Sequence, residues 1–262
     1  MKWITLWLFL MGAPLFGAEP VPVELKGIGI QEHLGDHISW EREFKDEFGH
    51  AKKLSSYFQN HRPVILLFVY YTCPNLCHYL LNGFVGSLKQ LPWSVGDKFD
   101  VITISINPKE RPSEAIGKKN ELLKTYAREA LLVSQHWHFL VGEEKNIQTL
   151  THDLGFNYRY DPETKEYAHS AAIMILTPDG KISRYLYGIQ FESRDLKLAL
   201  LEASQGKIGN VVDKLLLFCY HYDPKGRKYG ILAVNLMKIA GIVAVLLLGI
   251  MLLTLFIKKQ KK

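Results

Sequence analysis

The sequence predicts an α/β domain with a mainly parallel central sheet and an antiparallel edge. The continuous apolar run 64–71, rich in branched and aromatic residues, is typical of a strand buried on both faces, and 99–106 (FDVITISI) is predicted as a second buried strand. A helical stretch follows each predicted strand, at 75–89 and at 112–128. Strands that alternate with helices in this way form parallel sheets covered by helices.

The second half of the domain continues the alternation and then closes with a hairpin. We expect a strand at 137–141 and a helix at 143–154. The strands 170–176 and 182–187 flank Pro178-Asp179-Gly180, a tight-turn sequence that indicates an antiparallel pair. A last helix is expected at 193–203, and a short amphipathic helix at 52–59 is expected before the first strand.

Composition excludes several classes of protein. Of the 262 residues, 48% are hydrophobic and 22% charged, with three cysteines, which excludes a disordered chain or a disulfide scaffold. The formal net charge of +6 equals the charge of six lysines outside residues 19–237, namely Lys2, Lys238, Lys258, Lys259, Lys261 and Lys262. The excess positive charge is therefore evidence about the orientation of the chain in a membrane, and it gives no support for nucleic-acid binding.

Both ends of the chain carry membrane-targeting patterns. Residues 1–18 have the layout of a signal peptide, because Lys2 precedes an apolar stretch. Ala18 suits the cleavage site, whereas the bulky Phe16 does not, so cleavage and retention as an anchor both remain open. We predict a transmembrane helix at 236–257, since 239–257 contains only one polar residue and can span a bilayer core.

The charges at the two ends predict the orientation. The basic tail, 258–262, is expected in the cytoplasm by the positive-inside rule, as is Lys2. The remaining chain then faces the periplasm or the cell exterior from the inner (cytoplasmic) membrane of a bacterium. Within it we expect an extended N-terminal segment at 19–50, a folded domain at 51–205 and a membrane-proximal segment at 206–235.

A cysteine pair lies at the end of the predicted strand 64–71. Cys73 closes that strand and Cys77 lies four residues on, inside the following helix, so the two thiols can converge. A helix N-terminus lowers thiol pKa, which makes Cys73 prone to form the thiolate. The element order together with this pair is the thioredoxin layout. Such a pair can close a disulfide or present two soft ligands to a metal ion.

The spacing of the pair bears on that choice. Three residues separate the cysteines, which allows a disulfide but also leaves room for an ion, and soft thiolates select copper(I). A nitrogen ligand would let the site hold copper(II) too, and His169 is the candidate because it opens the hairpin strand in EYAHSAAIMILTPDG. On spacing alone, a surface or strand-capping role for His169 is the commoner alternative.

Four motifs occur in a recognisable order: FVYYTCPNLC, ITISINPKERPSEA, WHFLVG and YAHSAAIMILTPDGKISRYLYG. In this order the sequence resembles the Sco/SenC family over about residues 52–202. The resemblance implies a thioredoxin-like, membrane-tethered protein that binds copper through Cys73, Cys77 and His169. It also implies a client, the copper-containing subunit of cytochrome c oxidase, to which such proteins deliver copper or whose cysteines they keep reduced.

The sequence departs from the family pattern at several positions. His78 stands where the family usually has proline, Asn107 where the strand motif has aspartate, and Ala168 where an acidic residue commonly precedes the histidine. None of these changes removes a ligand, but each removes a neighbour that could tune the redox potential or docking. The expected anchor is C-terminal, whereas most of the family has it at the N-terminus, which leaves the client open.

Other functional classes remain as alternatives. The strongest is a thiol-disulfide oxidoreductase that uses Cys73 and Cys77 as a catalytic redox pair and carries no metal. Cys219 and His221, two residues apart near the predicted membrane helix, could chelate a soft metal or serve a sensor, although an interfacial aromatic segment is the more common explanation. His78 could also be an alternative ligand, but its helical position favours a solvent-facing side chain.

Overall fold

The computed structural model describes residues 27–73, 75–209, 241–242, 245–246 and 248–249. The chain divides into two units, Met1–Gly206 and Lys207–Lys262, and the elements below belong to the first. The predicted signal peptide, Cys219, His221 and most of the predicted transmembrane segment lie outside the described residues. Within the described ranges, no helix is long and apolar enough to cross a membrane.

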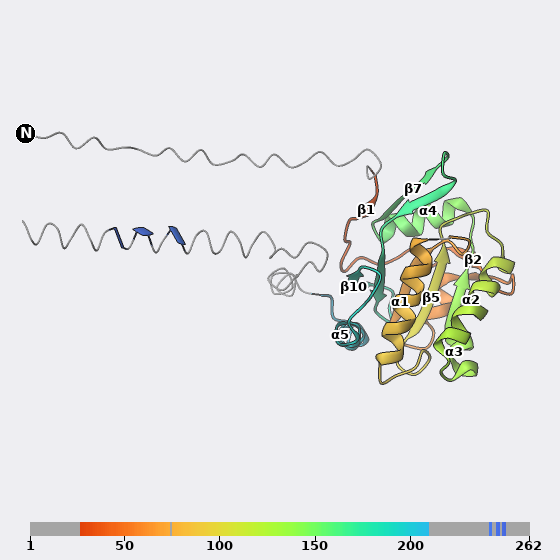
Figure 1. The fold of residues 1–262 in the computed structure, drawn as a ribbon. Helices are drawn as coiled ribbons and strands as arrows, with labels where there is room; N and C mark the ends of the chain where they lie inside the picture. Colours follow the sequence, from red (N-terminus) through yellow and green to blue (C-terminus); the bar gives the residue numbers. More distant parts are fainter. Residues whose placement is uncertain (1–26, 74, 210–240, 243–244, 247, 250–262) are drawn as a thin grey trace, which may run out of the picture. The chain divides into compact units, whose positions relative to one another are not determined.

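A five-stranded mixed sheet forms the centre of the domain (Figure 1). Its strand order is β10-β9-β4-β5-β6. The strands β4 (Val64–Val69), β5 (Asp100–Ser105) and β6 (Trp137–Leu140) run parallel, while β9 (Ala172–Leu176) and β10 (Ile182–Tyr187) are antiparallel to their neighbours. The predicted α/β class and the antiparallel hairpin edge are therefore confirmed.

The burial of the central strands explains their composition. Every residue of β4, β5 and β9 is buried, which is why β4 and β9 are apolar throughout; in β5 the polar residues Asp100, Thr103 and Ser105 are buried as well. β4 has β5 on one side and β9 on the other, so both of its edges are hydrogen-bonded. The end of β4 is consequently a rigid place from which to present the next residues of the chain.

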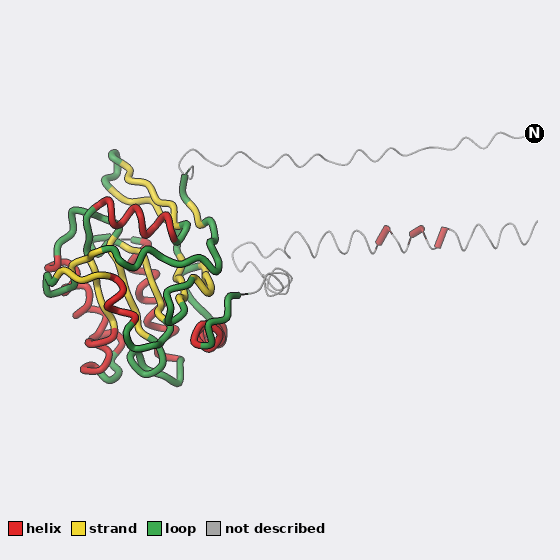
Figure 2. Tube along the Cα trace, turned by 180° about the vertical axis from the view of Figure 1, so that it is seen from behind, coloured by secondary structure: helices red, strands yellow, loops and turns green. Residues whose placement is uncertain are grey.

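Helices cover the sheet on both faces. Their bounds are α1 (Leu76–Gln90), α2 (Pro112–Tyr126), α3 (Ala130–His136), α4 (Glu144–Asp153) and α5 (Ser193–Ser204). The helix α1 packs against both α2 and α5 on the face seen in Figure 1, and α4 packs against β7 on the face seen in Figure 2. Phe84 of α1 meets Trp137 of β6 edge to face, with ring centroids 5.7 Å apart. This contact helps to fix α1, the helix that carries Cys77, on the sheet.

Several elements differ from the sequence-based expectation. A hairpin of β7 (Phe156–Asp161) and β8 (Glu166–His169) pairs with β1 (Gly29–Ile30) in a separate sheet and was not predicted. The short helix α3 was also missed. His169 ends β8, so the prediction that it opens the strand 170–176 is wrong, because β9 starts only at Ala172.

The N-terminal region before β4 is more structured than expected. The segment predicted as extended, 19–50, contains β1 and also β2 (Glu43–Lys45), which pairs with β3 (Ala51–Lys53). The predicted helix at 52–59 is a 3-10 helix over Leu54–Phe58. Its apolar face is buried as the amphipathic pattern predicted, with Leu54, Tyr57 and Phe58 inside.

Candidate functional site

The two cysteines lie at the junction of β4 and α1. Cys73 occupies the turn after β4, where its backbone N–H donates to the carbonyl of Tyr70 at 3.2 Å. Cys77 is the second residue of α1 and is 1% exposed, whereas Cys73 is partly exposed. Both thiols are free. The pair therefore consists of one accessible and one buried sulfur at the carboxyl edge of the parallel strands, where open α/β sheets bind ligands.

The sheet register brings His169 to this edge. Because β9 is antiparallel to β4, with Ile173 opposite Leu67, the start of β9 lies beside the end of β4. His169 precedes β9 by three residues and is 7% exposed. Its Nε2 lies 3.1 Å from Sγ of Cys77. The topology thus places together two of the residues that the sequence marked as ligands, although 92 positions separate them.

A second hydrogen bond determines the protonation of the His169 ring. Nδ1 lies 2.9 Å from the carbonyl oxygen of Ser170, which can only accept, so Nδ1 carries the proton. Nε2 then offers its lone pair to the Cys77 thiol. Burial lowers the pKa of His169, the main effect on this group, and keeps the ring neutral. A neutral ring fixed through one nitrogen is the form in which histidine binds metals.

The two thiols have opposite acid-base properties. A hydrogen bond from Cys77 is the main cause that lowers the pKa of Cys73 to about 5, and a second hydrogen bond from Tyr70 acts in the same direction. The same bond to Cys73, together with burial, raises the pKa of Cys77. The pair therefore shares one proton at neutral pH, with the negative charge on the accessible sulfur.

The proton of Cys77 faces two acceptors. One is the Cys73 thiolate and the other is Nε2 of His169. Loss of this proton would leave two sulfur atoms and one nitrogen atom with lone pairs available at the same place. A soft cation can then take the place of the proton. In the described part of the chain, however, no three side chains of the His, Cys, Asp or Glu type are already grouped to hold a metal ion. The two contacts of Cys77 are formed, and the full three-ligand group is not.

Two residues near the thiols were not singled out from the sequence. Tyr70 is 5% exposed and hydrogen-bonds Cys73, and burial is the main cause that raises the pKa of this phenol. Glu110 is 7% exposed and accepts hydrogen bonds from the residues just before Cys73. Both follow buried strands at the carboxyl edge of the sheet, which was the available signal, but nothing in the sequence indicated a buried glutamate.

The other histidine near the pair points away from it. His78 is exposed, and its ring bonds to Asn82 at 2.8 Å and lies 3.8 Å from Glu121 of α2. The structure therefore agrees with the solvent-facing orientation expected for His78. Cys219 and His221 lie outside the described residues, so their chelating role stays a prediction.

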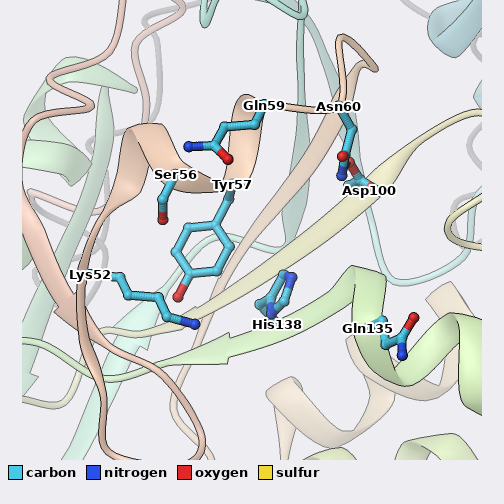
Figure 3. A pocket seen from close by; sticks show the side chains of 8 residues that line it. All are labelled: Lys52, Ser56, Tyr57, Gln59, Asn60, Asp100, Gln135 and His138. Carbon is cyan, nitrogen blue, oxygen red and sulfur yellow. Dashed lines mark hydrogen bonds between the residues drawn. The ribbon is translucent and has the colours of Figure 1, made fainter.

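A separate cavity of about 350 Å³ lies near the 3-10 helix and β6 (Figure 3). Its lining is polar and contains no cysteine: Lys52, Ser56, Tyr57, Gln59, Asn60, Asp100, Gln135 and His138. The rings of Tyr57 and His138 pack with centroids 4.6 Å apart, and burial is the main cause that lowers the pKa of His138 to about 4. This cavity offers neither the soft ligands nor the reactive thiol of the Cys73 region.

The fold and the site define a class of protein, a thioredoxin-like domain with a reactive dithiol and an adjacent histidine. A family model described as SCO1/SenC matches residues 41–198, more than half of the chain. The chain therefore belongs to the SCO1/SenC family. No curated protein matches the sequence closely enough to be counted as a relative.

Two solved structures with TM-scores above 0.5 share this fold, and a third structure is similar at a lower score. A putative electron transfer protein from Aquifex aeolicus VF5 is 19% identical, with a TM-score of 0.56, and the match covers 66% of this chain and 95% of that one. A SCO1/SenC family lipoprotein from Bacillus anthracis str. Ames is 13% identical, with a TM-score of 0.53 and coverage of 66% and 98%. ScoI of Arabidopsis thaliana, solved with copper bound, is 14% identical with a TM-score of 0.49 and coverage of 66% and 98%.

Proposed function

We propose that this protein is a membrane-anchored copper chaperone that serves assembly of the copper site of cytochrome c oxidase. Copper is its cargo, bound by the sulfurs of Cys73 and Cys77 and by Nε2 of His169. The observation that carries the proposal is the 3.1 Å distance between Nε2 of His169 and Sγ of Cys77, a thiol that also interacts with Cys73. Membership of the SCO1/SenC family supports the same ligands.

The residues present suit copper better than harder ions. Two thiolates and an imidazole select copper(I), and the imidazole also stabilises copper(II). Copper must displace the proton of Cys77, so binding releases a proton. When the metal binds, the sulfur of Cys73 completes the ligand set. Cys73 is the more accessible cysteine of the pair. A partly exposed third ligand would also allow transfer to a client thiol by ligand exchange.

The proposal is tested by anaerobic copper titration of the reduced full-length chain. We expect one copper per chain and, after oxidation, a thiolate-to-copper(II) charge-transfer band. The double variant Cys73→Ala, Cys77→Ala should bind no stoichiometric copper, and His169→Ala should lose the band. His78→Ala is the matched control, because its ring points away from the thiols. Stoichiometric copper in the double variant would overturn the proposal.

The second candidate function is a thiol-disulfide oxidoreductase that keeps the copper-site cysteines of a client reduced. The low pKa of Cys73, about 5, favours it, because an accessible thiolate attacks client disulfides while a buried thiol resolves the mixed disulfide. A Cys77→Ser variant would then accumulate a covalent complex with its client. Copper binding with no such complex would leave the chaperone as the function.

The membrane anchor is part of the proposal. The apolar stretch 239–257 and the basic tail support a single C-terminal span in the bacterial inner membrane, with the domain facing the periplasm or cell exterior. The six described residues of this stretch, at 241–242, 245–246 and 248–249, are helical. A reporter fused after Lys262 should be active only if it requires the cytoplasm. Activity of an export-dependent reporter there would reverse the orientation.

A further inference from the structure

Glu110 is a buried carboxylate that holds the chain just before Cys73. Its Oε1 accepts hydrogen bonds from the backbone N–H and the hydroxyl of Thr72, at 2.8 and 2.7 Å. Its Oε2 accepts from the backbone N–H of Tyr71 at 2.8 Å and from the hydroxyl of Ser105 at 2.6 Å. The side chain therefore joins the turn after β4 to the end of β5.

Burial of the Glu110 carboxylate would be energetically unfavourable without these hydrogen bonds. The residue is 7% exposed, and its four donors are all neutral. A buried carboxylate loses hydration that only strong hydrogen bonds replace, and bonds to an ionised acceptor are about twice as strong as neutral ones. Two of the donors are consecutive peptide groups, so the carboxylate fixes the backbone immediately before Cys73.

We propose that Glu110 is a positioning residue for the thiol pair: it clamps the Tyr71–Thr72 backbone so that the sulfur of Cys73 stays against that of Cys77. The inference rests on the proposed function, because it takes Cys73 and Cys77 as the working pair. The hydrogen bonds of Glu110 reach the residues before Cys73 and neither sulfur, and its charge separately makes a minor contribution to the raised pKa of Cys77. The effect of these hydrogen bonds is therefore on the effective concentration of one thiol at the other, which sets how readily the disulfide closes.

The glutathione equilibrium of the metal-free full-length protein measures this effective concentration. In Glu110→Gln an amide NH₂ group replaces one of the two acceptor oxygens. Either the two donors of Thr72 or the donors of Tyr71 and Ser105 therefore lose their acceptor. We expect the effective concentration to fall about tenfold, the scale of a lost hydrogen bond to a charged group. Glu121→Gln is the matched control, because its carboxylate also lies near α1, beside His78, and pairs with Lys118 of its own helix.

Thr72 supplies a second test in which the buried Glu110 is left unchanged. Thr72 is exposed, so its substitution should leave the fold intact. Thr72→Val removes the hydroxyl donor and should lower the effective concentration about threefold, whereas Thr72→Ser keeps the donor and should match the wild type. In the background of Glu110→Gln, Thr72→Val should have little further effect, because both act through one clamp.

These measurements separate the clamp from general destabilisation and from the copper function. A folded Glu110→Gln protein with the wild-type effective concentration overturns the clamp. If Glu110→Gln does not fold, a wild-type value in Thr72→Val overturns it instead. Equal losses in Thr72→Ser and Thr72→Val would also overturn it. No step uses copper, so a wild-type protein that binds no copper contradicts the proposed function and leaves the test of Glu110 intact.

Discussion

Nε2 of His169 lies 3.1 Å from Sγ of Cys77, and the hydrogen bond of Nδ1 to Ser170 leaves that Nε2 unprotonated. The imidazole is thus an acceptor for the thiol proton in the metal-free protein and a free lone pair once that proton leaves. The contact between His169 and Cys77 therefore has a role both before and after the thiol loses its proton. It also explains why a histidine is buried at this edge of the sheet.

The first prediction concerns the tautomer of His169. Nitrogen NMR of the reduced, metal-free protein should show a protonated Nδ1 and an unprotonated Nε2. Because burial lowers the pKa of this ring, the neutral form should persist below the ordinary histidine pKa of 6.5. The control is Cys77→Ala, which removes the thiol donor but should keep the tautomer, since the bond to Ser170 remains. A ring protonated at Nε2 would contradict the geometry.

The second prediction concerns the reactivity of Cys73. Alkylation by iodoacetamide, followed by mass spectrometry, should modify Cys73 with a midpoint near pH 5 and leave the buried Cys77 unmodified. Cys77→Ala should move the midpoint upward, because the bond from Cys77 is the largest cause of the low pKa. Tyr70→Phe should move it upward by less. A midpoint near 9, the ordinary thiol value, would contradict the shared-proton description.

The same pKa shift predicts a pH dependence of stability. Between about pH 5 and 9.0 the unfolded protein holds a proton on Cys73 that the folded protein has released, so the free energy of unfolding rises with pH. This contribution is lost as the pH falls through about 5. Cys73→Ser should flatten the slope, measured by urea unfolding under reducing conditions. An unchanged slope in that variant would assign the dependence to other groups.

The sequence was sufficient for much of the central sheet and the position of the thiols. A continuous apolar run predicted β4, and a segment rich in branched residues predicted β5, because every residue of both strands is buried. The pairing of Cys77 with His169 could not be derived from spacing, since it depends on the antiparallel register of β9 against β4.

Other parts of the site were not predictable for physical reasons. The β7–β8 hairpin lies outside the main sheet and is only partly buried along most of its length, so it has no strong apolar run. Glu110 is charged and follows a strand, which usually indicates a solvent-exposed residue. Its burial depends on four donors from three residues that come together only when the turn after β4 folds against β5.

The next prediction tests how α1 is held on the sheet. Phe84 is fully buried between Trp137 and Phe191, with ring centroids at 5.7 and 6.3 Å. Phe84→Ala should lower the free energy of unfolding by about 3–5 kcal/mol, because it removes buried apolar area and leaves a cavity. Leu131→Ala is the control: Leu131 is 77% exposed, and the change should be within about 0.5 kcal/mol. Similar losses in both variants in urea unfolding would contradict this packing.

The last prediction compares two glycines of the same helix. A Cβ on Gly83 would lie 1.7 Å from the carbonyl oxygen of Ile189, a backbone atom, so α1 or the loop after β10 would have to move. Gly83→Ala should therefore destabilise the protein by about 1–3 kcal/mol. A Cβ on Gly86 meets nothing within 4 Å, and Gly86→Ala should stabilise the helix by about 0.5–1 kcal/mol.

The two glycine variants also report on the site, because α1 carries Cys77. A shift of the helix by the Gly83 methyl should change the alkylation midpoint of Cys73, whose pKa depends on the bond from Cys77. Gly86→Ala should keep the wild-type midpoint. Urea unfolding and the alkylation profile together therefore distinguish a displaced helix from a merely less stable one. Equal behaviour of the two variants would show that the loop at Ile189 does not restrict α1.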